Sequence, residues 1–433
     1  MPQWREKEEI MFWKKRENAA NETATNEKQP TNWKRIAVVA AAGVVMAAVI
    51  AVVIIASNGG FTPRENDIYY KDSYTVSDSQ LNRTMDKVVA TIGPYSLTNR
   101  ELQVYYWMQV IDFINYYGAY LPYYGLDYTK PLDEQYTDQE KEMTWQQYFL
   151  QEAIYSWNYY TLLSHQGELT QFQLPEEYQQ TFENLYADLT ETLKKTDFET
   201  IDEMLQAEMG PAANFEAYEK YLRNYYAGNE YLTDIYNNIN PTDDEMEAYF
   251  AKNAEKLQST YKVNKTSGML ATVRHILIVP EGGEKDENNK TVYSDAEWKV
   301  CRRKAQDLLD KWLEGDKTEK SFAHLAAEHS QDPGSKDSGG IYTRFAKGKM
   351  VAPFENWSFD DYRVKGDVGI VETEYGCHIM YFVEADEGWK LYSADGVRGE
   401  KITEKIAKWR EELTMEVNYK KIALAEHTIG TQK

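Results

Sequence analysis

The chain has 433 residues, of which 70 are acidic and 48 are basic, so its formal net charge at pH 7 is −22. This length exceeds that of one typical domain and predicts two or three domains. The negative charge, with no large basic cluster beyond position 35, excludes nucleic acid as an expected partner. Two cysteines are too few for a disulfide-built fold, so packing must stabilise the domains, with a Cys301–Cys377 pair as the alternative to two buried thiols.

An apolar segment of 21 residues extends from Ile36 to Ala56. At about 1.5 Å rise per residue, a helix of this length matches the hydrocarbon thickness of a bilayer. We predict a transmembrane helix over residues 36–57, and a cleaved signal peptide is the alternative. Eight basic residues precede the segment and only two follow within twenty residues, which predicts a cytoplasmic tail over residues 1–35 and a single-pass chain whose bulk is extracellular.

Residues 58–84 are rich in polar residues and glycine, and we predict a tether there. A helical domain is predicted over residues 85–268, where a short strand precedes a capping box formed by Thr98 and Glu101. The first helix is unusually aromatic, with nine aromatic residues within twenty positions. Two interpretations stay open for these rings: they form the core of the domain, or they form an adhesive surface for unfolded chains.

The remaining elements predict an α+β multidomain fold. Capping boxes at Thr242 and Ser294 predict two more helix starts, and a boundary falls near residues 262–270. The order strand, helix, helix, loop and strand, short helix, strand, strand predicts a small α/β domain over residues 269–388. Residues 389–433 contain a helix that we expect to pack back on the helical domain, completing it with residues 396–427, through Ile402, Ile406, Trp409, Leu413 and Val417.

Two histidines interrupt strand-like apolar runs. Residues 273–279 read VRHILIV and residues 375–381 read YGCHIMY, so His275 and His378 occupy similar places in two strands. A buried polar ring costs free energy unless it is hydrogen-bonded, which predicts a shared polar site on a sheet. His324 and His329 lie about 140° apart on a helix, and no nucleophile elbow or phosphate-binding loop is present, so no metal, cofactor or covalent catalysis is predicted.

Five sequence motifs surround these histidines: RHIL at 274–277, FAHLAAEHSQD at 322–332, GG at 339–340, FAKGKMVAPFE at 345–355 and ETEYGCHI at 372–379. In this order they resemble a parvulin-type peptidyl-prolyl cis/trans isomerase, over about a quarter of the chain. The resemblance implies an inserted domain with an antiparallel sheet of about four strands. It also implies rotation of Xaa-Pro bonds without a covalent intermediate.

The resemblance implies roles for particular residues. The catalytic polar group would comprise His275, Asp332, His378 and Thr373, with Thr373 bridging the histidines. The proline ring would bind among the side chains of Met350, Phe354, Tyr342 and Phe345. The alternatives are that the histidines only stabilise the sheet through their own hydrogen bonds, and that Met350 and Phe354 are ordinary core residues.

Two features of this sequence modify what the resemblance implies. Many parvulins have GGDLG where residues 339–343 read GGIYT, so Tyr342 alters the wall of the proline slot. The alternative function is therefore a non-catalytic holdase whose degenerate parvulin domain only binds peptides. The loop after the first strand is acidic rather than basic, which disfavours phosphorylated substrates.

The helical regions on either side of this domain resemble those of the PrsA and SurA foldases. This resemblance implies an extracytoplasmic foldase and chaperone whose partners are unfolded or newly exported polypeptides containing Xaa-Pro. No cysteine lies near residue 57 to carry a lipid, so the segment from Ile36 to Ala56 would anchor the chain in the membrane of a Gram-positive-like cell. A sensor that signals through its cytoplasmic tail is a third alternative.

Overall fold

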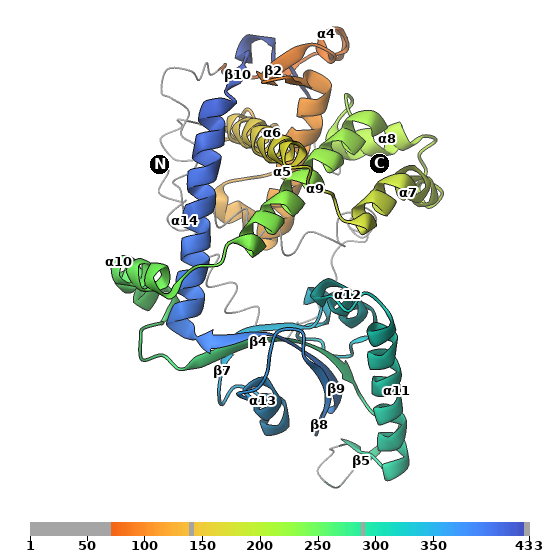
Figure 1. Cartoon of the computed structure of the whole chain (residues 1–433). Coiled ribbons are helices and arrows are strands. Elements are labelled where there is room, and N and C mark those ends of the chain that lie inside the picture. Colours follow the sequence, from red (N-terminus) through yellow and green to blue (C-terminus); the bar gives the residue numbers. More distant parts are fainter. Residues whose placement is uncertain (1–70, 138–142, 286, 288–290, 428–433) are drawn as a thin grey trace. The chain divides into compact units, whose positions relative to one another are not determined.

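The computed structural model describes residues 71–137, 143–285, 287 and 291–427, which divide into two compact units (Figure 1). The first unit comprises residues 71–240 and 398–427, and the second comprises residues 241–397. The predicted cytoplasmic tail and transmembrane helix lie outside the described residues. No helix within the described ranges has both the length and the apolar character that a membrane span requires.

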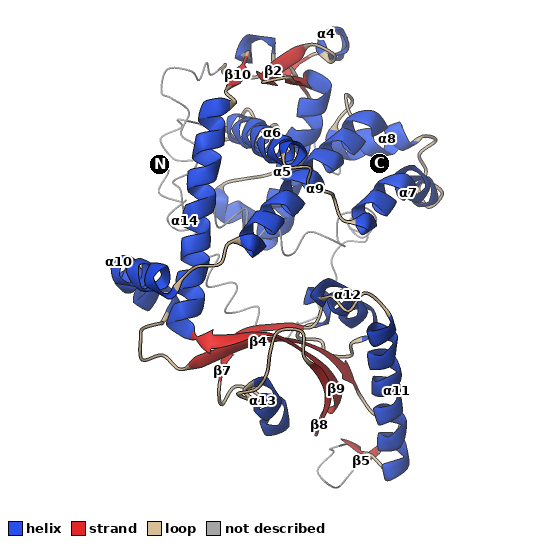
Figure 2. Ribbon diagram, viewed as in Figure 1, coloured by secondary structure: helices blue, strands red, loops and turns tan. Residues whose placement is uncertain are grey.

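The first unit is mainly helical and contains two small sheets (Figure 2). Its elements are β1 (Thr75–Val76), α4 (Asp78–Thr84), β2 (Val88–Ile92), β3 (Tyr95–Thr98), α5 (Asn99–Tyr117), η2 (Gly118–Tyr124), α6 (Trp145–Leu169), α7 (Glu176–Leu193), α8 (Ile201–Met209), α9 (Phe215–Asn238), the later part of α14 (Gly388–Glu412), β10 (Met415–Val417), η4 (Tyr419–Lys421) and β11 (Leu424–Ala425).

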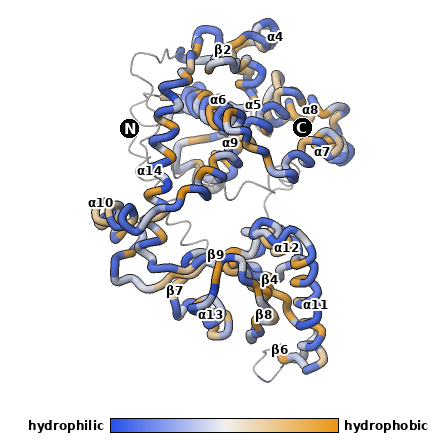
Figure 3. Tube along the Cα trace, viewed as in Figure 1, coloured by the Kyte–Doolittle hydropathy of each residue, from blue (hydrophilic) through white to orange (hydrophobic). Residues whose placement is uncertain are grey.

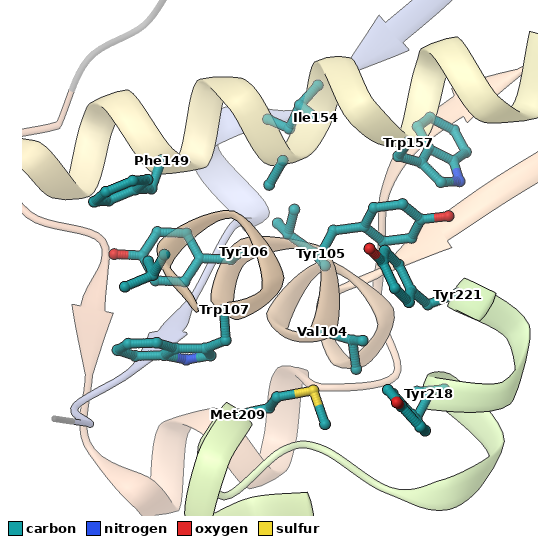
Figure 4. Packing of buried hydrophobic residues seen from close by; sticks show 14 of the residues in the cluster. Val104, Tyr105, Tyr106, Trp107, Phe149, Ile154, Trp157, Met209, Tyr218 and Tyr221 are labelled. Carbon is teal, nitrogen blue, oxygen red and sulfur yellow. The ribbon is translucent and has the colours of Figure 1, made fainter. Parts of the chain in front are cut away.

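The core of the first unit forms where α5, α6 and α9 pack together (Figure 4). Helix α5 begins at the predicted capping box, in which Thr98 accepts a hydrogen bond from the Glu101 amide. Tyr105 packs edge to face on Tyr221 of α9, with ring centroids 4.8 Å apart, and Tyr106 is equally buried. The core interpretation is therefore confirmed for the first aromatic residues of this helix.

The tyrosines at the end of α5 and in η2 behave differently. Tyr116 and Tyr123 are 44% and 70% exposed, and together with the half-buried Tyr117 and Tyr124 they form a tyrosine patch. Successive ring centroids in this patch lie 4.8, 4.8 and 5.6 Å apart. The core interpretation therefore does not extend to Tyr116 and Tyr123, and a surface for unfolded chains stays a prediction for this patch.

The two chain segments of the first unit are joined by strand pairing and by buried polar side chains. β1 pairs parallel with β11, and β10 pairs antiparallel with β2. From α5, Asn99 donates to the carbonyl oxygen of Lys421 (2.9 Å) and accepts from the amide of Ala423 (3.1 Å). Gln103 donates to the carbonyl oxygen of Ala423 (2.8 Å) and accepts from the amide of Ala425 (3.2 Å). The last described residues are therefore part of this core.

The structure differs from the sequence-based expectation at both ends of this unit. Residues 75–84, expected to be part of a tether, form β1 and α4, and Leu81 is fully buried. This order depends on pairing with β11, more than 300 residues away, which no local pattern indicates. In α14, Ile402 and Ile406 join the core as predicted, but Val417 lies in strand β10 rather than in the helix.

The second unit contains one larger sheet with helices on both faces (Figure 2). Its elements are α10 (Asp243–Tyr261), β4 (Met269–Ile278), β5 (Glu284–Lys285), β6 (Thr291–Val292), α11 (Asp295–Glu314), α12 (Glu319–His329), η3 (Lys336–Ser338), β7 (Ile341–Ala346), α13 (Ala352–Ser358), β8 (Val368–Thr373), β9 (Gly376–Glu387) and the beginning of α14.

The sheet has the strand order β7-β4-β9-β8, and all its pairs are antiparallel. Its two central strands, β4 and β9, each contain a long run of buried residues. Figure 3 shows hydrophobic segments among the strands of this sheet. Because side chains alternate between the faces, Ile276 and Ile379 pack against α11 and α12, whereas Val273 and Met380 face α13. Cys301 and Cys377 are buried free thiols on the first of these faces.

Helix α10 groups with the second unit, whereas the sequence placed the boundary after it, near residues 262–270. The physical reason is aromatic packing against the start of α14. Phe250 meets Trp389 with ring centroids 5.6 Å apart, and Tyr261 meets Tyr392 at 4.5 Å. These partners are distant in sequence, so the helical pattern of α10 alone could not indicate its neighbours.

We predict that Ile402→Ala lowers the free energy of unfolding of the first unit by about 2–5 kcal/mol, because truncating a side chain that is 1% exposed leaves a cavity. Denaturant titration followed by tryptophan fluorescence measures this change. Lys405→Ala, at an exposed position one turn away, is the control and should unfold like the wild type. Equal unfolding midpoints for Ile402→Ala and the control would contradict this placement of α14.

Candidate active site

The two histidines meet on the face of the sheet that α13 covers. His275 lies in β4 and His378 in β9, and the register pairs Leu277 with His378 and His275 with Met380. The histidines are therefore diagonal neighbours, and their Nδ1 atoms lie 3.0 Å apart. Both rings are buried, at 2% and 5% exposure. The predicted shared polar site on a sheet is thus present.

The loop after α12 brings a carboxylate to the outer nitrogen of His275. Asp332 Oδ2 lies 3.0 Å from His275 Nε2. The loop is attached to the end of β4, because the amide of Leu277 donates to the hydroxyl of Ser330 (3.1 Å) and the amide of Gln331 donates to the Leu277 carbonyl (2.8 Å). Asp332 is thereby held beside the histidine pair.

Ser335 is a member of the site that sequence reasoning missed. Its hydroxyl lies 2.9 Å from His275 Nε2 and donates to Asp332 Oδ2 at 2.5 Å. A turn returns it to the site, with the amide of Lys336 donating to the Asp332 carbonyl (3.0 Å). The available signal was the turn-forming Pro333 and Gly334 between an aspartate and a serine.

The rest of the loop is fixed by a buried arginine and a glycine. Arg274, which is 4% exposed, donates to the carbonyl oxygen of Gly339 (2.9 Å) and pairs with Glu319. Gly340 has φ +74°, and a Cβ atom there would lie 2.2 Å from the His275 carbonyl oxygen. The amide of His275 donates to the carbonyl oxygen of Gly340 (2.7 Å), so this close approach requires glycine.

With neutral rings of His275 and His378, the hydrogen bonds from Thr373 through the two histidines to Asp332 can all be donated in the same direction along the chain. Thr373 Oγ1 accepts from the amide of Tyr375 (3.1 Å), so its proton is available to His378 Nε2 at 2.8 Å. His378 then donates from Nδ1 to Nδ1 of His275, and His275 donates from Nε2 to Asp332. Each ring nitrogen has a partner, and the chain of donors ends on a carboxylate.

The electrostatic surroundings agree with this assignment. Burial, with a smaller contribution from His275, lowers the pKa of His378 to about 4. For Asp332, partial burial opposes ionisation, but hydrogen bonds from His275, Ser335 and Tyr342 outweigh it and hold the pKa of this carboxyl well below its ordinary value. At neutral pH the site therefore contains a neutral His378 and an ionised Asp332.

The four predicted substrate-binding residues lie beside this polar group. Phe354 is buried and directs its ring edge-on at His275 and His378, with centroid distances of 5.3 and 5.4 Å. Phe345 contacts Phe354 at 6.1 Å, and the half-buried Met350 packs in the same cluster. Tyr342 stacks on the ring of His275 at 5.2 Å. All eight predicted residues are therefore brought together. The predicted bridging role of Thr373 is wrong, because of the two histidines its hydroxyl contacts His378 alone, and the two histidines contact each other directly through their Nδ1 atoms.

The chemistry available here is hydrogen bonding, charge and apolar contact. Among the residues that the structure describes, no group of three or more His, Cys, Asp or Glu side chains is arranged to hold a metal ion. A cavity of about 400 Å³ lies in the first unit between β2 and residues 416–421, and it contains none of the eight site residues. The polar group with its apolar neighbours is thus the candidate active site.

Comparisons with known proteins match this region. Residues 256–386 match the family described as the PPIC-type PPIASE domain. Foldase protein PrsA of Caldanaerobacter subterraneus subsp. tengcongensis is 24% identical over 214 residues, which cover 49% of this chain and 56% of that protein. Foldase protein PrsA 2 of Listeria monocytogenes is 36% identical over 110 residues, covering 25% and 29%. The chain thus spans about half or less of the length of these curated relatives.

Among solved structures, PrsA from Bacillus subtilis aligns at 18% identity and a TM-score of 0.24, covering 63% of this chain and 91% of that one. This likeness is too weak to support a conclusion about the whole chain.

We predict that His378 titrates with a midpoint of about 4 in the folded protein, against an ordinary value of 6.5. Between these values the unfolded state binds more protons, so stability should fall as the pH falls from about 6.5 to 4. Imidazole NMR signals followed during a pH titration measure the midpoint. The same protein in urea is the control and should titrate near the ordinary value. A folded midpoint near 6.5 would refute the neutral, buried assignment.

Proposed function

We propose that this chain, whose residues 256–386 form a parvulin-type peptidyl-prolyl cis/trans isomerase domain, catalyses rotation about Xaa-Pro bonds and assists the folding of exported polypeptides. The observation that carries the proposal is the hydrogen-bonded group of His275, His378 and Asp332 beside the apolar side chains of Met350 and Phe354. Roles for all eight site residues belong to this proposal.

The reaction needs differential binding rather than bond making. Rotating an amide through its twisted state costs about 18–20 kcal/mol, because resonance between nitrogen and carbonyl is lost. The planar amide oxygen carries partial negative charge, which decreases as the bond twists. A carboxylate such as Asp332 beside this oxygen therefore destabilises the planar form more than the twisted form, which lowers the barrier.

The apolar residues would hold the proline ring in place for this rotation. Met350 and Tyr342 are half-buried, whereas Phe354 is buried and contacts the rings of both histidines. A five-membered ring held among these side chains would be fixed while the preceding residue rotates. The buried histidines would keep Asp332 in its place, since His275 Nε2 contacts its Oδ2 directly.

The proposed substrates are unfolded, exported chains that contain Xaa-Pro and lack phosphate. Support for the export setting comes from the likeness to PrsA foldases and from the apolar segment of residues 36–56, which lies outside the described residues. Glu281, in the loop after β4, forms an ion pair with Lys304 of α11. The charge of this lysine is therefore already balanced by a carboxylate rather than left to bind a phosphate. Membrane anchoring and the extracellular position of the two units remain predictions.

We expect the His275→Ala/Met350→Ala variant to isomerise an Xaa-Pro peptide at least about tenfold more slowly than the wild type, equivalent to about 1.4 kcal/mol in the barrier. The rate is measured in a protease-coupled assay or by NMR exchange. His324→Ala, which removes an exposed histidine on α12 outside the site, is the matched control and should keep the wild-type rate. Equal rates for the wild type and the double variant would favour the holdase alternative.

The tyrosine patch favours a second activity, the holding of unfolded chains by the first unit. Tyr123 is 70% exposed, and each ring of the patch contacts the next one. Tyrosine offers a large contact area with few rotatable bonds, so such a surface binds apolar segments of varied sequence. This activity is compatible with isomerisation in the second unit.

We predict that the Tyr116→Ser/Tyr123→Ser variant suppresses aggregation of an unfolded client less well than the wild type. The concentration of variant needed for half-maximal suppression should be about threefold higher or more, since aromatic contacts contribute about 0.5–1.5 kcal/mol each. Light scattering of a diluted denatured protein measures this. Tyr186→Ser is the matched control, because Tyr186 is 60% exposed but lies on α7, where it packs on Phe215. If both variants suppress aggregation alike, the patch is not the client surface.

A further inference from the structure

We propose that Ser335 and Tyr342 are positioning residues whose hydroxyl groups keep the carboxyl group of Asp332 ionised and fix it against the histidine pair. The proposal rests on the isomerase function proposed above and deepens it. It assigns a role to a serine that sequence reasoning missed. It also gives a second role to a tyrosine that the sequence suggests only as part of the slot wall.

Three donors converge on one oxygen of Asp332. Ser335 Oγ donates to Oδ2 at 2.5 Å, Tyr342 OH donates to it at 3.0 Å, and His275 Nε2 lies at 3.0 Å. A carboxylate oxygen gains about twice as much energy from such bonds as a neutral acceptor, so the carbonyl oxygen of a carboxyl group protonated on Oδ1 would accept the same three bonds more weakly. The contacts therefore favour the charged form.

The second oxygen of Asp332 is left for another partner. Within the described part of the chain, Oδ1 makes no hydrogen bond, and the side chain is 15% exposed. The arrangement thus separates the two oxygens: Oδ2 is occupied by the protein, and Oδ1 makes no bond to it. In the proposed mechanism, Oδ1 is the charged atom that would lie beside the carbonyl oxygen of a bound Xaa-Pro bond.

The donors come from different elements, and each is held independently. Ser335 is 1% exposed, and its carbonyl oxygen accepts from the amides of Gly340 (2.7 Å) and Ser338 (3.1 Å). Tyr342 lies in β7, and its ring stacks on His275 at an interplanar angle of 23°. If Asp332 rotated away, the buried hydroxyl of Ser335 would lose a strong acceptor, which costs free energy. The carboxyl is therefore held in one orientation.

The titratable groups that face Asp332 reinforce this state. They are His275 on β4, Tyr342 on β7 and, behind His275, His378 on β9. Burial and the neighbouring carboxylate raise the pKa of Tyr342 well above its ordinary value, so the phenol keeps its proton and stays a donor. The departure of Tyr342 from the usual parvulin pattern therefore contributes to the polar group rather than only changing the slot wall.

The test is a pH titration of the Asp332 carboxyl carbon by NMR in the intact protein. In the wild type this signal should stay at its ionised position down to the lowest pH at which circular dichroism shows the fold intact. In the Ser335→Ala/Tyr342→Phe variant the midpoint should rise by about two pH units, because each lost bond to a charged group changes the midpoint by about one unit. Each single variant should give about half this rise.

Three variants separate positioning from folding defects. Ser335→Thr keeps the hydroxyl and should restore the wild-type titration if Ser335→Ala is impaired. Tyr342→Phe keeps the stacked ring and removes only the hydroxyl. Tyr375→Phe removes a phenol from a residue that is 57% exposed and should leave the Asp332 signal unchanged. A double variant that folds and still keeps Asp332 ionised to the same pH as the wild type would overturn the proposal.

A kinetic measurement adds an independent readout. The acid limb of the isomerisation rate should move to higher pH in the double variant, because the carboxylate is lost earlier on acidification. If the wild type shows no isomerase activity, the proposed function fails, yet the carboxyl titration still decides whether Ser335 and Tyr342 hold Asp332. If the wild type is active and the acid limb does not move, the positioning role is refuted while the function stands.

Discussion

The burial of two imidazole rings in one sheet is the constraint on which the second unit depends. A buried ring nitrogen without a partner is costly, so all four nitrogens of His275 and His378 must find one. The antiparallel register of β4 and β9 supplies the contact between the rings, and β8 supplies Thr373. The last nitrogen requires the loop after α12, and the close approach of Gly340 to β4 follows from the same need.

Local signals in the sequence predicted local structure well. The capping boxes at Thr98, Thr242 and Ser294 each begin a helix where expected, since a cap depends on residues three positions apart. The order of the longer strands and helices in the second unit was also predicted from the sequence, whereas the short strands β5 and β6 were not. The predictions that failed concern contacts between distant parts of the sequence. β1 forms by pairing with β11, and α10 belongs to the second unit because its aromatic rings pack on those of α14. No periodicity within either segment reports such partners.

The candidate site shows the same division. The eight residues suggested by the motifs are assembled in one place, because those motifs come with the strand order that brings them together. Ser335 was missed because the Pro333-Gly334 turn before it indicates a change of chain direction but does not show that the serine hydroxyl returns to Asp332. The hydroxyl contact of Tyr342 was missed for another reason: the sequence shows that the residue is unusual, but only coordinates show that its oxygen lies 3.0 Å from Asp332.

The discontinuous first unit has a consequence for the order of assembly during synthesis. A chain emerges from its amino end, and the described residues of the second unit form one segment, 241–397, so this segment can become native as soon as residue 397 has emerged. The first unit cannot complete its fold until residues 421–425 have emerged, because these residues contain the backbone partners of Asn99 and Gln103 in α5. Until then its aromatic helices lack their final strand partners, so the first unit is the last part of the described chain to complete its fold.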